Sequence, residues 1–365
     1  METVVSWRCT HLAGRGLLPP LVLDDQNPYA LPIDPDVAVE PARVAHHFDP
    51  EDYGVGLTRA FVELVGDGLA TGVRLPILVA RGAHPGPVFG LTAGVHGNEL
   101  NGIPVIHQLI RELDISSLHG TVVGVVAVNV PGLHANQRRF IDGADLNRIF
   151  PGSPHGSVSE VFAHRVIHRI VHRFDMLVDL HTASFGRVNS LYVRADMSDP
   201  TTAAMARLQH PQIIVHNPAG DRTLRGAAMT LGVPAITVEI GDPQRWQRNL
   251  TRDALAGVRR VLSWAKLTKP VEDSSIVDTV VCSSSSWVYT DRGGLLTVFP
   301  RLMDRVRKDE RIALVHNAFG DAIREYRAPH DGIVVGKSTN PVGYTGARVL
   351  HLGRIAGPGE FQHNA

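Results

Sequence analysis

The chain has 365 residues, enough for one large domain and a smaller one, and its 36 lysine and arginine residues balance 36 aspartate and glutamate residues. Because the charges balance, the chain has no net electrostatic attraction for nucleic acid or an anionic membrane. No apolar run approaches the roughly 18 residues of a membrane-spanning helix, so we expect neither nucleic acid nor a membrane as a partner. Only two cysteines occur, Cys9 and Cys282, and the first residues do not resemble a signal peptide, so we expect no disulfide framework and a cytoplasmic protein.

Residues 1–50 are rich in proline and lack periodicity, and we treat them as an N-terminal arm of unknown role. Strands and helices then alternate up to about residue 272. The segment TVVGVVAVNV is typical of a buried strand, whereas Ile103, Ile106 and Ile110 recur at helical spacing. This alternation predicts an α/β domain over residues 51–272, with a mixed, largely parallel sheet covered by helices on both faces.

The last part of the chain has a different pattern of apolar residues. Short apolar segments separated by turns predict a small all-β domain over residues 280–365. Its pattern resembles half of a biotinyl or lipoyl carrier barrel, a barrel-sandwich fold. Because Lys337 does not lie in a convincing modification motif, we expect this domain to be a scaffold rather than a carrier.

Three predicted strands each end on a residue that can bind a metal or move a proton. His96 and Glu99 follow the first of these strands, His181 ends the second and Glu239 ends the third. Two imidazoles and one carboxylate form a three-ligand zinc set with an open fourth position, which is the mark of a catalytic site. Ligands gather beyond the carboxyl ends of such strands, so the pattern predicts a hydrolase with one zinc ion per chain.

A glycine-containing loop that follows the buried strand TVVGVVAVNV carries polar side chains suited to a carboxylate. Asn147 and Arg148 are adjacent, and a guanidinium can bind a carboxylate through two hydrogen bonds. Arg138 and Arg139 precede them in the same loop. One of these two could face an oxyanion or a second carboxylate, and a solvated pair is the alternative.

Two further residues lie near these motifs. We expect Asp179 to point to the opposite side of its strand from His181, and therefore to support the sheet or a ligand rather than bind metal. Tyr344 could reach over the pocket as a lid or could be a plain turn residue, and the sequence does not decide between them.

Four motifs occur in the order found in the zinc carboxypeptidase-like superfamily: HGNE, NQRRFIDGADLNRIFPG, DLHTA and TVEIG. Their spacing and the C-terminal β segments resemble the succinylglutamate desuccinylase and aspartoacylase branch, over roughly residues 55–360. The resemblance implies that the zinc ligands are His96, Glu99 and His181.

The same resemblance implies roles for the remaining residues of the site. Glu239 would be the general base and acid, and Arg139 would polarise the scissile carbonyl. Asn147 and Arg148 would hold a substrate carboxylate, with Arg138 as a further substrate-binding residue. The choice between Arg138 and Arg139 stays open, because the length of this loop differs among branches.

The activity predicted from these features is zinc-dependent hydrolysis of the amide bond of a small N-acyl amino acid or related N-acyl amine. The alternative is a metallocarboxypeptidase that acts on peptide C-termini, since the same residues serve both reactions. The C-terminal β domain favours the deacylase, because it can narrow the entrance to small substrates. A non-catalytic metal- or metabolite-binding protein is a third alternative, and a homo-oligomer is compatible with the sequence.

Overall fold

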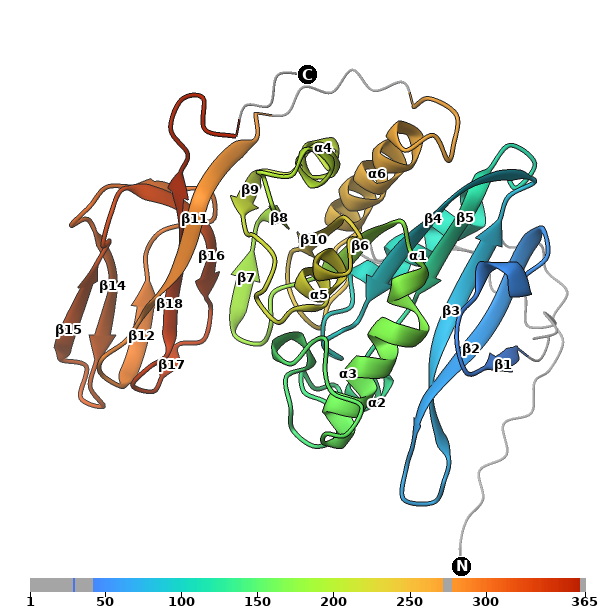
Figure 1. Cartoon of the computed structure of the whole chain (residues 1–365). Helices are drawn as coiled ribbons and strands as arrows, with labels where there is room; N and C mark the ends of the chain where they lie inside the picture. Colours follow the sequence, from blue (N-terminus) through green and yellow to red (C-terminus); the bar gives the residue numbers. More distant parts are fainter. Residues whose placement is uncertain (1–28, 30–41, 272–277, 362–365) are drawn as a thin grey trace, which may run out of the picture.

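The computed structural model describes residues 29, 42–271 and 278–361. A mixed sheet of 14 strands runs through this part of the chain, and a second sheet of four strands packs beside its C-terminal end (Figure 1). Most of the expected N-terminal arm lies outside the described residues. Within it, the strand β1 (Arg43–Ala45) pairs in parallel with the edge of the sheet, and the hydroxyl of Tyr29 lies 2.9 Å from Nδ1 of His107.

The long sheet joins the two parts of the chain. In spatial order after β1, its strands are β2 (Gly56–Gly66), β3 (Gly72–Arg81), β5 (His119–Val125), β4 (His84–Ala93), β6 (Met176–His181), β10 (Ala235–Ile240), β8 (Leu191–Ala195), β9 (Ile213–His216), β11 (Val280–Tyr289), β18 (Arg348–Ile355), β16 (Gly332–Ser338) and β13 (Arg305–Val306), with β7 (Arg187–Asn189) paired to β16. The central strands β5, β4, β6 and β10 are parallel, so their carboxyl ends meet at one edge. This arrangement confirms the predicted mixed α/β sheet.

Helices cover both faces of the sheet, as predicted. One face packs against α1 (Gly102–Glu112), α4 (Pro200–Leu208) and α6 (Arg248–Trp264). The other face packs against α3 (Val158–Arg169) and α5 (Leu224–Thr230). The shorter helices are α2 (Val130–His134), η1 (Pro50–Asp52), η2 (Leu146–Arg148) and η3 (Val171–Arg173). The predicted periodicity of α1 has a physical basis, because Ile103, Ile106 and Ile110 are buried in one of the two cores.

The C-terminal region is rich in β structure. Its second sheet contains β12 (Gly294–Val298), β14 (Arg311–His316), β15 (Ala322–Arg327) and β17 (Val342–Gly343), and it encloses a separate apolar core with the end of the long sheet. The ammonium group of Lys337 donates to the carbonyl oxygens of Val298 and Pro300. The expected division of the chain at residues 272–280 falls largely on residues outside those described.

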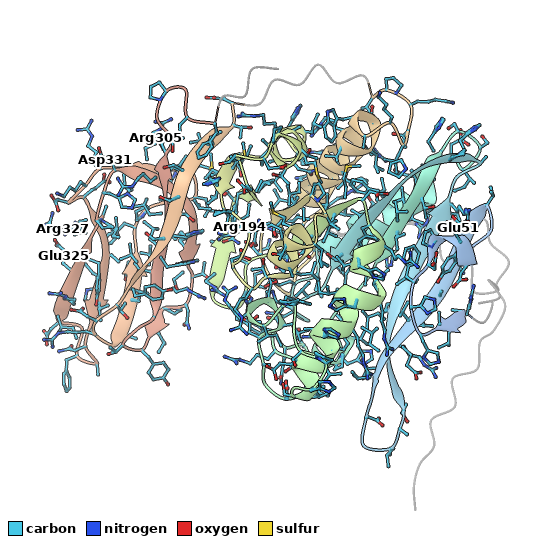
Figure 2. All side chains as sticks on the ribbon, viewed as in Figure 1. Glu51, Arg194, Arg305, Glu325, Arg327 and Asp331 are labelled. Atoms are coloured by element: carbon cyan, nitrogen blue, oxygen red, sulfur yellow. The ribbon has the colours of Figure 1, made fainter. Side chains whose placement is uncertain are left out.

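Two strand pairings attach this β-rich region to the rest of the molecule. β11 pairs in parallel with β9, and β7 pairs antiparallel with β16. Figure 2 shows Arg194 of β8 between the two parts of the molecule, whereas Glu325 and Arg327 lie on the far side of the β-rich region. Residues of this region are thereby brought to the carboxyl edge of the main sheet. Among the described residues, no helix is both long enough and apolar enough to cross a membrane.

Candidate active site

The first site residues lie in a tight turn between β4 and α1. β4 ends at Ala93, and Gly94 adopts a positive φ of 61° that redirects the chain. A Cβ on Gly97 would lie 2.0 Å from the backbone carbon of Gly132, so only glycine fits where the turn passes α2. The turn places the side chains of His96 and Glu99 in the interior, where they are 3% and 2% exposed.

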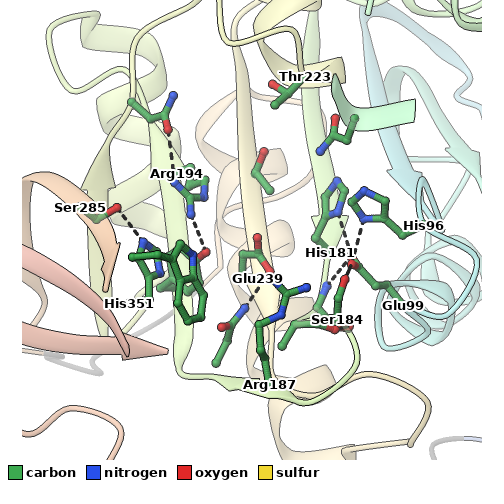
Figure 3. Close-up of a pocket in the computed structure, with 18 of the residues that line it drawn as sticks. His96, Glu99, His181, Ser184, Arg187, Arg194, Thr223, Glu239, Ser285 and His351 are labelled. Atoms are coloured by element: carbon green, nitrogen blue, oxygen red, sulfur yellow. Dashed lines mark hydrogen bonds and ion pairs between the residues drawn. The ribbon is translucent and has the colours of Figure 1, made fainter. Parts of the chain in front are cut away.

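His96, Glu99 and His181 form what we call the metal set. Nδ1 of His96 lies 2.8 Å from Oε1 of Glu99, and Nδ1 of His181 lies 2.9 Å from Oε2 of the same carboxylate. One candidate ligand atom from each residue can be chosen so that all lie within 4.8 Å of one another. Figure 3 shows the two imidazoles converging on Glu99. The structure therefore brings together the three residues that the sequence separates by up to 85 positions.

The outer nitrogen of each imidazole contacts a second carboxylate. Nε2 of His181 lies 2.8 Å from Oδ2 of Asp179, whose Oδ1 accepts a hydrogen bond from Thr92, and Nε2 of His96 lies 3.1 Å from Oδ1 of Asp145. Our expectation that Asp179 points away from His181 is wrong. Residues two apart on a strand lie on the same face, so Asp179 reaches the histidine directly. Such contacts orient a histidine for metal binding through its other nitrogen.

The chemistry of these donors fits a metal ion. Nδ1 of His96 is buried and makes no hydrogen bond, because its short approach to Glu99 lacks the geometry for one. Burial alone would raise the pKa of Glu99, yet the neighbouring His96 and His181 hold this pKa well below its usual value. A buried anionic carboxylate facing two imidazole nitrogens is a donor set that a divalent cation can satisfy.

Glu239 lies on the strand next to His181. β10 and β6 are paired so that Glu239 is directly opposite His181, which places its carboxylate beside the metal set. Nδ2 of Asn189 donates to Oε2 of Glu239 over 3.1 Å. Burial is the main cause that raises the pKa of this carboxyl group. A raised pKa suits a group that both accepts and returns a proton near neutral pH.

The structure separates the two neighbouring arginines of the loop. Arg138 lines the pocket, where its guanidinium donates to Oε1 of Glu99 over 2.9 Å and to Oδ2 of Asp145 from two nitrogens. It also donates to the hydroxyl of Ser184. Arg139 does not line the pocket, and its guanidinium donates instead to the backbone oxygen of Gly143. The expected position of Arg139 at a scissile carbonyl therefore does not match the structure, because adjacent side chains of this loop point in different directions.

Asn147 and Arg148 both line the pocket, as expected. They belong to the short helix η2, which begins after Asp145. Oδ1 of Asn147 accepts a hydrogen bond from the backbone nitrogen of Leu224, so its amide nitrogen remains available. Arg148 donates to the backbone oxygen of Asn147. The amide of Asn147 and the guanidinium of Arg148 thus come from adjacent residues that line the cavity.

The cavity around these residues has a volume of about 400 Å³. The sequence prediction missed several residues that line it, namely Arg187, Arg194, Arg225, Trp287, Arg348 and His351. The one local signal was Arg187, which follows His181 closely in the sequence. The sequence suggested that the C-terminal β domain narrows the entrance, but it did not indicate which residues of that domain line the cavity. Tyr344 does not line the cavity, and its side chain is 85% exposed.

Comparison with known proteins bears directly on this site. The family model of the succinylglutamate desuccinylase/aspartoacylase catalytic domain matches residues 85–265, which include the metal set and Glu239. The chain belongs to the succinylglutamate desuccinylase/aspartoacylase family. A relative in Halomonas elongata, the N-alpha-acetyl-L-2,4-diaminobutyric acid deacetylase, is 27% identical over 73% of this chain and 81% of its own length. The succinylglutamate desuccinylase of Pseudomonas paraeruginosa is 30% identical over 44% of this chain and 52% of that protein.

Solved structures of other proteins share this fold. The crystal structure of a succinylglutamate desuccinylase/aspartoacylase from Rhodobacter sphaeroides has a TM-score of 0.76 at 24% identity, over 87% of this chain and all of that one. The product-bound ectoine utilization protein EutE from Ruegeria pomeroyi has a TM-score of 0.74 at 23% identity, over 82% and 96% of the two chains. The relatives in Halomonas elongata and Pseudomonas paraeruginosa are a deacetylase and a desuccinylase by name, and these matches support deacylase chemistry for this family member.

Proposed function

We propose that the protein is a cytoplasmic, zinc-dependent amidohydrolase that cleaves the amide bond of small N-acyl amino acids. The observation that supports this most is the placement of the metal set beside Glu239 in one cavity. One zinc ion per chain would be held by His96, Glu99 and His181. Zinc bound there would polarise the substrate carbonyl and lower the pKa of water to about 7.

The remaining steps fall to side chains of the chain itself. The carboxylate of Glu239 accepts the proton of the attacking water and passes it to the nitrogen of the leaving amine. Its buried position, with a raised pKa, favours this double use. The amide of Asn189 holds one carboxylate oxygen, which orients the group toward the metal set.

Arg138 takes the role that the sequence suggested for Arg139. Its guanidinium is held by Asp145 and lies against Glu99, so it can oppose charge that develops on the carbonyl oxygen without moving. Asn147 and Arg148 bind the carboxylate of the amino acid through the amide nitrogen and the guanidinium. Asn147 and Arg148 thus hold the substrate by its carboxylate, while Arg138 polarises the carbonyl group of the scissile amide.

The walls of the cavity favour a small substrate over a peptide. Trp287, Arg348 and His351 of the β-rich region line the same cavity as the metal set. A cavity of about 400 Å³ closed from two sides accommodates a ligand of small-molecule size. A long peptide chain needs a wider mouth, so this geometry favours the deacylase over the carboxypeptidase.

A substrate screen with the zinc-loaded enzyme tests the proposal. We expect hydrolysis of N-acetyl, N-formyl or N-succinyl amino acids, slow hydrolysis of the matching N-acyl amines that lack the amino acid carboxylate, and poor cleavage of peptides of four or more residues. The Glu239→Gln protein, purified in parallel, reports activity from contaminants. Preference for long peptides over every N-acyl amino acid would establish the carboxypeptidase instead, and hydrolysis of no amide would refute the proposal.

A further inference from the structure

Glu239 has a directly paired neighbour on each side in the sheet. On β6 this neighbour is His181, and on β8 it is Tyr192. Side chains of residues that lie directly opposite one another in a sheet project from the same face, so the imidazole, the carboxylate and the phenol form a row. All three line the cavity. The proposed chemistry uses the first two members of this row and leaves the third, Tyr192, without a role.

The phenol of Tyr192 is held in a buried position next to Glu239. Tyr192 is 2% exposed, and the ring of His351 from the β-rich region lies 6.0 Å from its ring in a T-shaped arrangement. Burial is the main cause that raises the pKa of Tyr192, and the charge of Glu239 and its hydrogen bonding to the phenol raise this pKa further. The phenol therefore keeps its proton at neutral pH, within reach of the carboxylate.

Arg194 determines the direction in which the phenol donates its proton. Figure 3 shows Arg194 on the opposite side of Glu239 from His181. Nη2 of Arg194 donates to the hydroxyl oxygen of Tyr192 over 3.0 Å, and the guanidinium carbon is 5.3 Å from the centre of the tyrosine ring. A guanidinium has donors but no acceptor, so the phenol oxygen must accept this bond. The proton of the phenol is left for another acceptor, and the carboxylate of Glu239 is the one beside it.

Arg194 is itself fixed by a second hydrogen bond. Its Nη1 donates to Oδ1 of Asn217 over 3.3 Å, and Nδ2 of Asn217 donates in turn to Oδ2 of Asp221 over 3.0 Å. Burial raises the pKa of Glu239, and the charge of Arg194 is among those that oppose this rise. A hydrogen bond from a cation makes a hydroxyl group a stronger donor, so the positive charge of Arg194 acts on the carboxylate through Tyr192.

A carboxylate that moves a proton must keep one oxygen directed at the reacting water. Nδ2 of Asn189 donates to Oε2 of Glu239 over 3.1 Å, but the last torsion of a glutamate side chain is soft and one donor leaves it free to turn. We propose that Tyr192, oriented by Arg194, donates its proton to Glu239 as a second donor and thereby holds this carboxylate in position for proton transfer. The inference rests on the proposed function and deepens it, with Tyr192 and Arg194 as positioning residues.

Removal of a single hydroxyl group tests this role in the zinc-loaded, full-length enzyme. In Tyr192→Phe we expect kcat for an N-acyl amino acid to fall by about 10- to 100-fold, the usual effect of losing a hydrogen bond to a charged group, while KM and zinc content stay near wild type. Arg194→Met should cause a smaller loss of kcat, because the phenol remains but is no longer oriented. Tyr326→Phe, which removes a hydroxyl bonded to Asp291 on the remote sheet, should keep the wild-type kcat. An unchanged kcat in Tyr192→Phe, or a change in KM alone, overturns the proposal.

A spectroscopic measurement separates the hydrogen bond from the reaction. The chain has six tyrosines, so protein labelled with carbon-13 at the tyrosine Cζ gives six resonances, and the one lost in Tyr192→Phe belongs to Tyr192. We expect this resonance to shift in Arg194→Met and in Glu239→Gln, and to stay in place in Glu325→Gln, an exposed site on β15. If no amide is hydrolysed but the resonance responds to both changes, the proposed function fails and the bond between Tyr192 and Glu239 stands. A resonance that does not respond to Glu239→Gln shows that the phenol donates elsewhere, and it overturns the inference whatever activity is found.

Discussion

The metal set and the pair of Arg187 and Arg348 line the same cavity, and their charges are compensated to different degrees. Around the metal set, every imidazole nitrogen faces a carboxylate, and the supporting groups Asp145 and Asp179 have partners of their own. The pair of Arg187 and Arg348 rests on an aromatic ring without an acidic partner among the described residues. The charges of the metal set are therefore compensated by neighbouring side chains, whereas the guanidinium groups of Arg187 and Arg348 line the cavity without an ion pair among the described residues.

Removal of a metal ligand should have the largest effect. His181→Ala takes away one of three ligands, so we expect zinc to fall well below one per chain and hydrolysis to fall to the background of the assay. Elemental analysis and turnover measure the two effects. His84→Ala, at the far end of β4 and exposed, serves as the histidine control. Full zinc occupancy in His181→Ala would remove this residue from the metal set.

Loss of the proton carrier should reduce activity while the metal stays. Glu239→Gln keeps the size of the side chain and one oxygen that can accept from Asn189, so we expect zinc content and fold to persist and kcat to fall by about 100-fold or more. Kinetics and elemental analysis on the same preparation check this. Near-normal turnover would show that another group moves the proton.

The two adjacent arginines provide a matched comparison. Arg138→Gln should lower kcat/KM by about 100-fold, because a fixed donor at the developing oxyanion is lost. Arg139→Gln should stay within about twofold of wild type, because its side chain lies outside the cavity. Equal losses in both variants would indicate that the loop, rather than Arg138, is responsible.

Loss of the Asp179 carboxylate, which supports His181, should reduce zinc binding and activity less than loss of His181 itself. Asp179→Asn should weaken zinc binding or activity by about 10- to 100-fold, because the carboxylate that orients the imidazole is replaced. Competition with a chelator measures the affinity, and thermal unfolding verifies that the buried substitution leaves the protein folded. Thr92→Val, which removes only the hydrogen bond to Asp179, should show a smaller change in the same direction.

The smallest effect is expected on the arginine side. Trp287→Leu removes the ring that contacts the guanidinium groups of Arg187 and Arg348 in the cavity, and we expect KM for N-acyl amino acids to rise by about 3- to 10-fold. Zinc content should equal that of wild type, since the ring contacts of Trp287 are with His351, Arg187 and Arg348 and not with a candidate ligand. A loss of zinc in this variant would mean that the two sides are not independent.

Much of the metal side could be predicted from the sequence for a simple reason. His96, Glu99, His181 and Glu239 each follow or end an apolar strand, and the carboxyl ends of neighbouring parallel strands meet at one edge. The helical spacing of α1 and the alternation of strands and helices likewise depend on local burial patterns. These patterns are local to each strand and helix, so the sequence determined the class of fold, its elements and the candidate ligands.

The remaining features depend on how distant segments meet. The choice of Arg138 over Arg139 is made by the path of an irregular loop, which no periodicity describes. The pairing of β9 with β11 and of β7 with β16 brings Trp287 and Arg348 to the cavity from a region that we expected to act as a scaffold. Strand pairing over such distances is set by packing of the whole molecule, so only the tertiary structure decided which charges surround the substrate.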